Sequence, residues 1–246
     1  MGKQNAGKIQ FYWISFMTGL FTLWACINMI LSSYLLSNSR LYIDRVLSVW
    51  ANRLLNLIKL TIEVKGISNL EKFEDKPIII MSNHSSLYDI PIAVKALNFS
   101  VRFMAKKELY KIPIFGSALK RAEFISIDRQ NHDEALKNLQ KAKELMLGGI
   151  TLWVSPEGTR SKNGKLSRFK RGGFHLAIDT SAMIVPIAVK GIHNVQAGKE
   201  LKICLNQKIE VEICQPVDAS QYTTSNKNEL VEEVRDRMLT ALHQKD

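Results

Sequence analysis

Hydrophobic positions divide the chain into an apolar N-terminal part and a longer part in which short apolar runs alternate with periodic segments. No charged residue occurs from Ile9 to Ser39, and the stretch from Phe11 to Leu31 is almost entirely apolar. About 20 apolar residues are enough to cross a bilayer as a helix. The stretch is too long for the core of a signal peptide, and a buried core helix is disfavoured because it would be apolar all round. Attachment to a membrane is predicted.

A second helix is predicted directly afterwards, between Leu41 and Leu60. Apolar residues recur there at helical spacing, namely Ile43, Val46, Leu47, Trp50, Leu54, Leu57 and Ile58. A helix with such a stripe can lie in the headgroup plane of a membrane. Residues 1–60 are therefore predicted to form an interfacial or re-entrant helix pair. Cations flank the apolar segment on both sides, so the positive-inside rule gives no orientation.

The remaining residues, 61–246, show the alternation of an α/β domain, for which we expect a mixed, mostly parallel sheet flanked by helices. The expected strands are Ile62–Val64, Ile78–Met81, Arg102–Met104, Phe124–Ile127, Thr151–Val154, Val185–Val189, Lys202–Leu205 and Ile209–Ile213. The expected helices are Ile90–Leu97, Asp133–Leu147 and Asn226–His243.

The formal net charge of +11 calls for an anionic partner. Nucleic acid is disfavoured as a partner, because the chain has no recognisable nucleic-acid module. Its long uncharged N-terminal segment also fits such a partner poorly. An anionic membrane surface and acidic proteins remain as candidate partners. The three cysteines are widely spaced, and no histidine is paired with a His or Cys at ligand spacing. We therefore expect a reducing compartment and no metal.

A candidate general base follows the apolar run that ends at Met81. His84 and Asp89 are five residues apart in the segment NHSSLYD, and on one continuous helix they would lie roughly 140° apart. Pro91 is tolerated only in the first turn of a helix, so the helix should begin close to Asp89 and leave His84 in a loop. The imidazole can then contact the carboxylate, which fixes its tautomer and makes the other nitrogen a better base. A histidine that merely caps the helix also fits this spacing.

A candidate anion site follows the second long apolar run, Ile150–Val154, in the segment SPEGTR. Arg160 lies just past the expected strand, and a guanidinium binds phosphate through two hydrogen bonds without losing its charge. Glu157 cannot bind phosphate, so we expect it to hold Arg160 or a backbone amide in place. The five further cations between Lys162 and Arg171 are interpreted as a solvated loop.

Five sequence blocks, taken in order, resemble the glycerolipid acyltransferase family, and most of all its bacterial 1-acyl-sn-glycerol-3-phosphate acyltransferases. The blocks are NHSSLYD, KKELYKIPIFG, ISIDR, SPEGTRS and IVPIAV, and they lie between Pro77 and Gly191. The resemblance implies that His84 is the base and Asp89 its orienting partner. It also implies a substrate-binding set of Lys106, Arg129, Glu157, Gly158, Thr159 and Arg160. Members of the family have an amphipathic N-terminal helix pair that lies on the membrane.

The resemblance implies transfer of an acyl group from acyl-CoA or acyl carrier protein to the sn-2 hydroxyl of lysophosphatidic acid. No cofactor is expected besides this co-substrate, and no acyl-enzyme, because no Ser or Cys lies in a GxSxG-like turn. Acylation of glycerol-3-phosphate or another lysophospholipid is the alternative reaction, and non-catalytic binding of anionic lipid is the alternative outside the enzymes. We expect the protein at the cytoplasmic face of a membrane, the inner membrane if the source is bacterial.

One position departs from the family pattern. The family usually has a glycine at the position of Glu123, which lies four residues before Ile127 in the ISIDR block. A carboxylate that faced the site would oppose an anionic acceptor. We expect the side chain of Glu123 to point to solvent.

Overall fold

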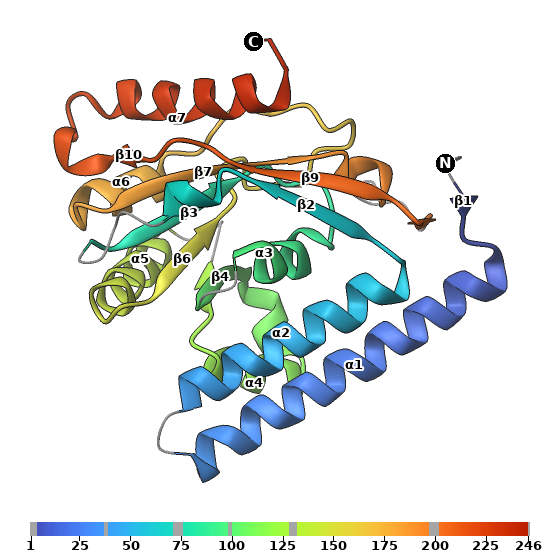
Figure 1. Cartoon of the computed structure of the whole chain (residues 1–246). Helices are drawn as coiled ribbons and strands as arrows, with labels where there is room; N and C mark the ends of the chain where they lie inside the picture. The colour runs from blue at the N-terminus through green and yellow to red at the C-terminus, as the bar shows by residue number, and fades with distance from the viewer. Residues whose placement is uncertain are drawn as a thin grey trace.

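The computed structural model describes residues 4–36, 39–70, 76–97, 100–127, 132–196 and 202–245. Its main sheet has the strand order β2 (Thr61–Lys65), β9 (Lys208–Ile213), β7 (Met183–Lys190), β3 (Ile78–Ser82), β6 (Thr151–Val154), β4 (Val101–Lys106) and β5 (Ile125–Ile127), and β10 (Val217–Asp218) pairs with β7. The helices are α1 (Lys8–Leu35), α2 (Ser39–Leu57), α3 (Asp89–Leu97), α4 (Phe115–Arg121), α5 (His132–Leu147), α6 (Gly172–Asp179) and α7 (Lys227–Leu242). In Figure 1, α7 and the helix pair α1–α2 lie on opposite sides of the sheet.

The predicted mixed, mostly parallel sheet is confirmed. β3 pairs in parallel with both β6 and β7, β4 with β5 and β6, and β2 with β9. β9 and β10 run antiparallel to β7. The expected strand Lys202–Leu205 is reduced to β8 (Cys204–Leu205), which pairs with β1 (Gln4–Asn5) outside the main sheet. The sequence pattern did not predict α6, whose first two residues are glycines, the least helix-favouring residues after proline.

Alternating residues along the central strands bury the two faces of the sheet. In β3, Ile80 joins one hydrophobic cluster, whereas Ile79 and Met81 join the other. In β6, Trp153 likewise belongs to the first cluster and Leu152 to the second. The first cluster includes side chains from α1 to α4, and the second includes side chains from α5 to α7. Because side chains of a strand alternate between faces, one apolar run can supply both cores.

The apolar stripe of α2 faces the protein, which corrects the prediction that it lies in a headgroup plane. Ile43, Val46 and Leu47 are buried in the same hydrophobic cluster as residues of the sheet. Trp50, another residue of this stripe, donates from its indole Nε1 to the hydroxyl of Thr22 on α1 at 3.2 Å. The spacing correctly indicated one buried face, but a hydrophobic stripe alone does not distinguish lipid from protein as the partner that covers it.

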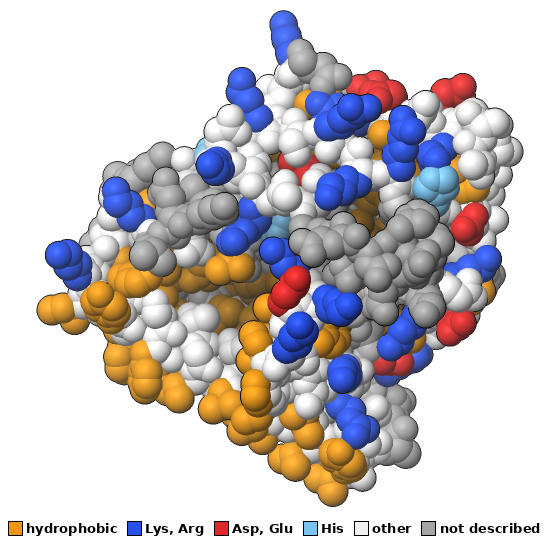
Figure 2. All heavy atoms as spheres, turned by 180° about the vertical axis from the view of Figure 1, so that it is seen from behind, with side chains coloured by type: hydrophobic (Ala, Val, Ile, Leu, Met, Phe, Trp, Pro, Cys, Tyr) orange, Lys and Arg blue, Asp and Glu red, His pale blue; other side chains and the backbone are white. Residues whose placement is uncertain are grey.

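Helix α1 presents an exposed apolar face. Its exposed large hydrophobic residues are Ile9, Tyr12, Trp13, Phe16, Leu20, Leu23, Ile27, Leu31, Tyr34 and Leu35. Among the described residues, α1 is the one helix that is long and apolar enough to cross a membrane, and only 22% of its most hydrophobic window is buried. Figure 2 shows a band of hydrophobic side chains along this edge, with Lys and Arg side chains gathered above it. This surface supports membrane association.

Both ends of α1 are attached to the α/β domain. At the start of the helix, the N–H of Ala6 donates to the carbonyl oxygen of Ile203 at 2.9 Å, beside the β1–β8 pair. At the other end, Arg121 of α4 donates to the hydroxyl of Tyr34 at 2.8 Å, and its guanidinium carbon lies 4.6 Å from the centre of that ring. Polar contacts at both ends therefore set the position of α1 relative to the sheet.

A buried ion pair joins α2 to the sheet. The side chain of Arg102 in β4 is fully buried, and its Nη1 lies 2.6 Å from Oδ1 of Asp44. The hydroxyl of Ser100 donates to the same oxygen at 3.1 Å. A buried guanidinium without a counter-ion is strongly destabilising, so the pair constrains how α2 packs on the sheet.

We expect Asp44→Ala to lower the free energy of unfolding by about 3 kcal/mol, because it leaves the guanidinium of Arg102 buried without a counter-ion. Thermal unfolding in detergent would measure the loss. Asp236→Ala, which removes an exposed carboxylate from α7, is the control and should change stability little. An Asp44→Ala protein as stable as this control would show that the ion pair does not hold α2.

Candidate functional site

The candidate residues converge because three parallel strands end at the same edge of the sheet. β6 pairs in parallel with β3 on one side and with β4 on the other. The loop that carries His84 follows β3, the segment that carries Arg160 follows β6, and Lys106 is the last residue of β4. Ligands in open α/β sheets bind at the carboxyl ends of the strands. Sequence blocks that are far apart in the chain are thus brought to one place.

His84 and Asp89 form the contact that the sequence predicted. Nδ1 of the imidazole lies 2.6 Å from Oδ2 of Asp89, which also accepts from the backbone N–H groups of Ser85 at 2.8 Å and Ser86 at 3.0 Å. The helix begins at Asp89, as expected. An ionised carboxylate can only accept hydrogen bonds, so Nδ1 carries the proton and donates it. Nε2 is left with its lone pair, which is the state that a general base needs.

The burial of the two groups differs in a way that suits proton transfer. The side chain of Asp89 is 1% exposed, whereas that of His84 is 23% exposed. The imidazole packs edge-on against Trp153, with ring centres 6.2 Å apart. A buried carboxylate that is bonded only to neutral donors would stabilise the imidazolium formed when Nε2 accepts a proton. The histidine can therefore reach a ligand while its partner stays out of water.

The backbone of His84 is bound to the segment that follows β6. Its N–H donates to Oε1 of the buried Glu157 at 2.8 Å, and its carbonyl oxygen accepts from the N–H of Ser161 at 2.7 Å. Oε2 of Glu157 accepts from both the N–H and the hydroxyl of Ser167, at 2.9 and 2.8 Å. Glu157 thus holds backbone amides in place, one of the two roles expected for it, and both of its oxygens are used within the protein.

Asn83 holds the start of the histidine loop against the neighbouring strand. Its side-chain amide donates to the carbonyl oxygen of Val189 at 3.0 Å, and its Oδ1 accepts from the N–H of Val189 at 2.8 Å. The buried side chain thereby takes the place of a strand partner for β7 just beyond the end of β3. The position of His84 is consequently restrained on both sides of the residue.

Two features of the structure favour glycine at position 158. Its φ of +71° lies in the left-handed region, which side chains with a Cβ rarely adopt. A Cβ at this position would also lie 2.8 Å from Cε and 3.1 Å from Nζ of Lys170. The backbone N–H of Lys170 donates to the carbonyl oxygen of Pro156 at 2.8 Å. Lys170, which the sequence pattern placed in a solvated loop, therefore lies directly against the candidate phosphate-binding block.

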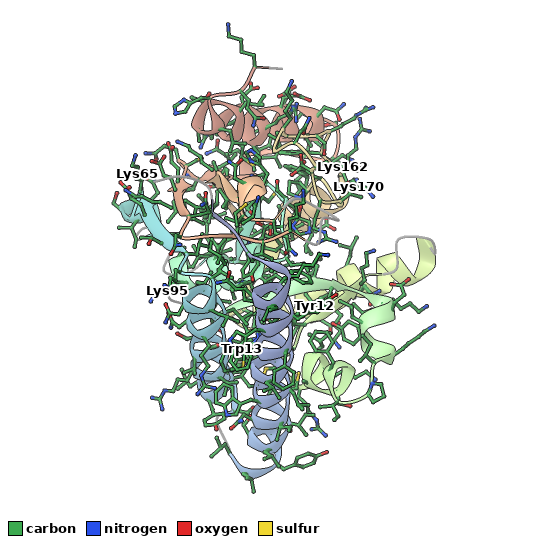
Figure 3. All side chains as sticks on the ribbon, turned by 90° about the vertical axis from the view of Figure 1, so that its right-hand side faces the viewer. Tyr12, Trp13, Lys65, Lys95, Lys162 and Lys170 are labelled. Atoms are coloured by element: carbon green, nitrogen blue, oxygen red, sulfur yellow. The ribbon has the colours of Figure 1, made fainter. Side chains whose placement is uncertain are left out.

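The cations around this loop are available to bind an anion. Arg160, Lys106 and Lys170 have no side-chain hydrogen bond or ion pair with another residue in the described part of the chain. Thr159 is exposed beside Arg160. In Figure 3, Lys162 and Lys170 lie on one side of the molecule, and Lys65 and Lys95 lie on the other. The close approach of Lys170 depends on the path of the chain after Pro156, which no sequence pattern indicated.

The sequence also singled out Arg129 and Glu123. Arg129, which the family pattern placed in the substrate site, lies outside the described residues. The side chain of Glu123 is 27% exposed, and its carboxylate forms a bidentate pair at the surface with Arg40 of α2, at 2.7 and 2.8 Å, instead of standing free in solvent. It precedes β5 and so lies at the edge where the parallel strands begin, opposite His84. Its φ of +58° explains why a glycine is favoured at this position.

Comparisons with known proteins show the family to which this chain belongs. Residues 61–190 match the family model described as Acyltransferase. The chain is 31% identical to 1-acyl-sn-glycerol-3-phosphate acyltransferase alpha of Mus musculus over 185 residues, which cover 75% of this chain and 64% of the mouse protein. It is 31% identical to 1-acyl-sn-glycerol-3-phosphate acyltransferase of Haemophilus influenzae over 198 residues, which cover 78% of this chain and 79% of that protein.

A solved structure has the same fold. The crystal structure of the 1-acyl-sn-glycerophosphate acyltransferase PlsC from Thermotoga maritima matches with a TM-score of 0.81 and 24% identity, over 96% of this chain and 94% of that one. The chain therefore belongs to the acyltransferase family, which confirms the resemblance found in the five sequence blocks. It spans less than two thirds of the length of the mouse relative.

We expect Glu157→Gln to fold normally but to lose about 10- to 100-fold in kcat, because an amide NH₂ would face N–H donors where the carboxylate oxygens now accept. Initial rates and circular dichroism on the same preparations would measure both effects. Glu229→Gln makes the same carboxylate-to-amide exchange at an exposed position of α7, outside the substrate-binding set, and is the matched control. Full activity of Glu157→Gln would mean that the two loops do not depend on this carboxylate.

Proposed function

We propose that this protein is a membrane-associated acyltransferase that moves a fatty acyl group from a thioester to the sn-2 hydroxyl of lysophosphatidic acid, giving phosphatidic acid. The observation that carries the proposal is the imidazole of His84, held through Nδ1 by Asp89, beside a loop that holds Arg160 and Lys170. A base with a lone pair beside unpaired cations suits a substrate that has a hydroxyl and a phosphate. Non-catalytic lipid binding would not need the 2.6 Å contact to the buried Asp89.

The reaction needs one base and no protein nucleophile. Nε2 of His84 takes the proton of the lipid hydroxyl while the oxygen attacks the thioester carbonyl carbon. The tetrahedral intermediate then collapses and breaks the carbon–sulfur bond. The departing sulfur receives the proton from the imidazolium, so the products are an ester and a free thiol. Asp89 stabilises the imidazolium between the two steps, and base assistance of this kind contributes about 10²–10⁴ to a rate.

The cations are proposed to hold the phosphate of the acceptor. Arg160 can form two parallel hydrogen bonds to phosphate oxygens, and Lys106 and Lys170 add point charges. We keep Arg129 in this set as a proposal from the family pattern. Glu123, the residue that put an anionic acceptor in doubt, is ion-paired to Arg40 at the other edge of the sheet. Nothing at its position opposes a phosphate in the site.

The membrane is proposed to supply the acceptor. The exposed apolar face of α1 would lie in the bilayer, and the basic surface above it would meet anionic headgroups, which attract each nearby Lys or Arg by about 1 kcal/mol. Figure 2 shows a hollow with hydrophobic side chains between these two regions, where an acyl chain could lie. We propose the cytoplasmic face of the membrane, with coenzyme A or acyl carrier protein as the donor of the acyl group.

The direct test is transfer of a labelled acyl group from acyl-CoA or acyl carrier protein to lysophosphatidate in vesicles. We expect His84→Ala to lose about 10² or more of the rate while it stays folded and membrane-bound, because the base is gone. His243→Asn, at the exposed C-terminal end of α7, should keep the wild-type rate.

Two outcomes would contradict parts of the proposal. Full activity in His84→Ala would exclude the mechanism. A wild-type protein that acylates glycerol-3-phosphate or another lysophospholipid, but not lysophosphatidate, would exclude the acceptor and keep the reaction class.

The side chain of Lys170 lies against Gly158, in the block proposed to bind the acceptor phosphate. Lys170→Met should raise the KM for lysophosphatidate about tenfold and change kcat little, because a charge-assisted contact to the phosphate is lost. Lys162→Met removes an equal charge from the same segment and should leave that KM unchanged. Equal KM values in the two variants would exclude Lys170 from the phosphate site.

A further inference from the structure

A basic pocket lies between the segment that follows β6 and the helix α7. Its volume is about 340 Å³, which falls in the range of small-ligand sites. The pocket is lined by Arg168, Phe169, Arg171, Asn228, Val231, Glu232 and Arg235. Three guanidinium groups against one carboxylate give this pocket a net positive charge. None of these residues belongs to the set proposed above for the lysophosphatidate phosphate.

Two of the three arginines have guanidinium groups that are available to bind a ligand. Arg168 and Arg171 are exposed, and neither has a side-chain hydrogen bond or ion pair within the described ranges of the chain. Arg235 instead donates to the carbonyl oxygen of Ser167 at 2.8 Å, and its guanidinium carbon lies 5.6 Å from the centre of the Phe169 ring. The pocket thus combines one fixed arginine with two that are available to a ligand.

The helix ends around the pocket add to its positive potential. Arg171 is the N-cap residue of α6, and Asn228 is the second residue of α7, which is 16 residues long. The N-terminal end of a helix carries a partial positive charge and unpaired N–H groups, both of which favour anions. An anionic ligand is therefore favoured by the backbone as well as by the side chains.

The pocket shares its wall with the catalytic loop. Ser167, which directly precedes Arg168, binds Oε2 of Glu157 through its N–H and its hydroxyl, and Oε1 of Glu157 accepts from the N–H of His84. A ligand in the pocket would rest on the same scaffold as the imidazole, with Glu157 and Ser167 between them. This arrangement suits a long molecule that is held by an anion at one end and reacts at the other.

We propose that this pocket binds the phosphate-bearing part of the acyl-thioester donor, an inference that rests on the transferase activity proposed above. Coenzyme A and acyl carrier protein both carry the acyl group on a phosphopantetheine arm, so a phosphate lies at a distance from the thioester in each donor. Guanidinium groups bind such phosphates through paired hydrogen bonds. The acceptor phosphate and the donor phosphate would then have separate sites, both of which use the segment that follows β6.

The variant Arg168→Gln/Arg171→Gln tests the proposal by separating the two KM values. We expect the KM for palmitoyl-CoA to rise about tenfold or more, because charge-assisted hydrogen bonds to phosphate are lost. The kcat and the KM for lysophosphatidate should stay within about twofold of wild type. Lys95→Gln/Lys245→Gln removes two exposed charges elsewhere and is the matched control. An unchanged donor KM, or an equal rise in the control, would overturn the proposal.

Binding of coenzyme A without turnover separates this inference from the proposed function. In titration calorimetry with the full chain in detergent, wild type should bind coenzyme A and the arginine variant should bind it at least tenfold more weakly. Such a result in a protein with no transferase activity would keep the pocket and reject the function. Equal binding by both proteins, with an active wild type, would overturn the pocket.

A comparison of donors identifies the source of the phosphate. If the arginine variant loses activity with both palmitoyl-CoA and acyl carrier protein, the shared phosphopantetheine phosphate is the group that is bound. A loss with only one of them assigns the pocket to that donor. No loss with either donor would overturn the proposal.

Discussion

The carboxylate of Glu157 is buried, and its two oxygens accept hydrogen bonds from two different loops. A buried carboxylate without donors would be strongly destabilising, so the N–H of His84 and the Ser167 groups must stay where they can reach it. The loop that follows β3 and the segment that follows β6 are therefore held together. The imidazole and the cations Arg160 and Lys170 belong to these two segments, and their relative positions depend on this carboxylate and on the hydrogen bond from the N–H of Ser161 to the carbonyl oxygen of His84.

The helix pair α1–α2 places an exposed apolar surface on one side of this site. Helix α2 packs on the sheet through its apolar stripe and through the pair of Asp44 with the buried Arg102, and α1 covers α2 while its own outer face stays apolar and exposed. The lower edge of the molecule is thus hydrophobic, and the Lys and Arg side chains lie above it on the same face (Figure 2). A site between an apolar band and a basic region is suited to a lipid whose headgroup is anionic.

Much of this architecture follows from local patterns in the sequence. Apolar runs identified the central strands because a doubly covered parallel strand is apolar throughout, and Pro91 located the start of α3 and so the loop position of His84. Other features depend on tertiary contacts. The stripe of α2 did not reveal what covers it, and α6 begins with two glycines. The ion pair of Glu123 with Arg40, and the approach of Lys170 to Gly158, join residues from different segments, for which periodicity and motifs hold no signal.

Asp89 and the backbone contacts of His84 fix the imidazole as the tautomer that can accept a proton at Nε2. The most direct test is a nitrogen-15 NMR spectrum of histidine-labelled protein in detergent micelles, recorded at a pH where the ring is neutral and assigned with His84→Ala. We expect a protonated Nδ1 and an unprotonated Nε2 for His84, and loss of that preference in Asp89→Ala. A His84 ring that carries its proton on Nε2 would show that Asp89 does not orient the imidazole as a general base.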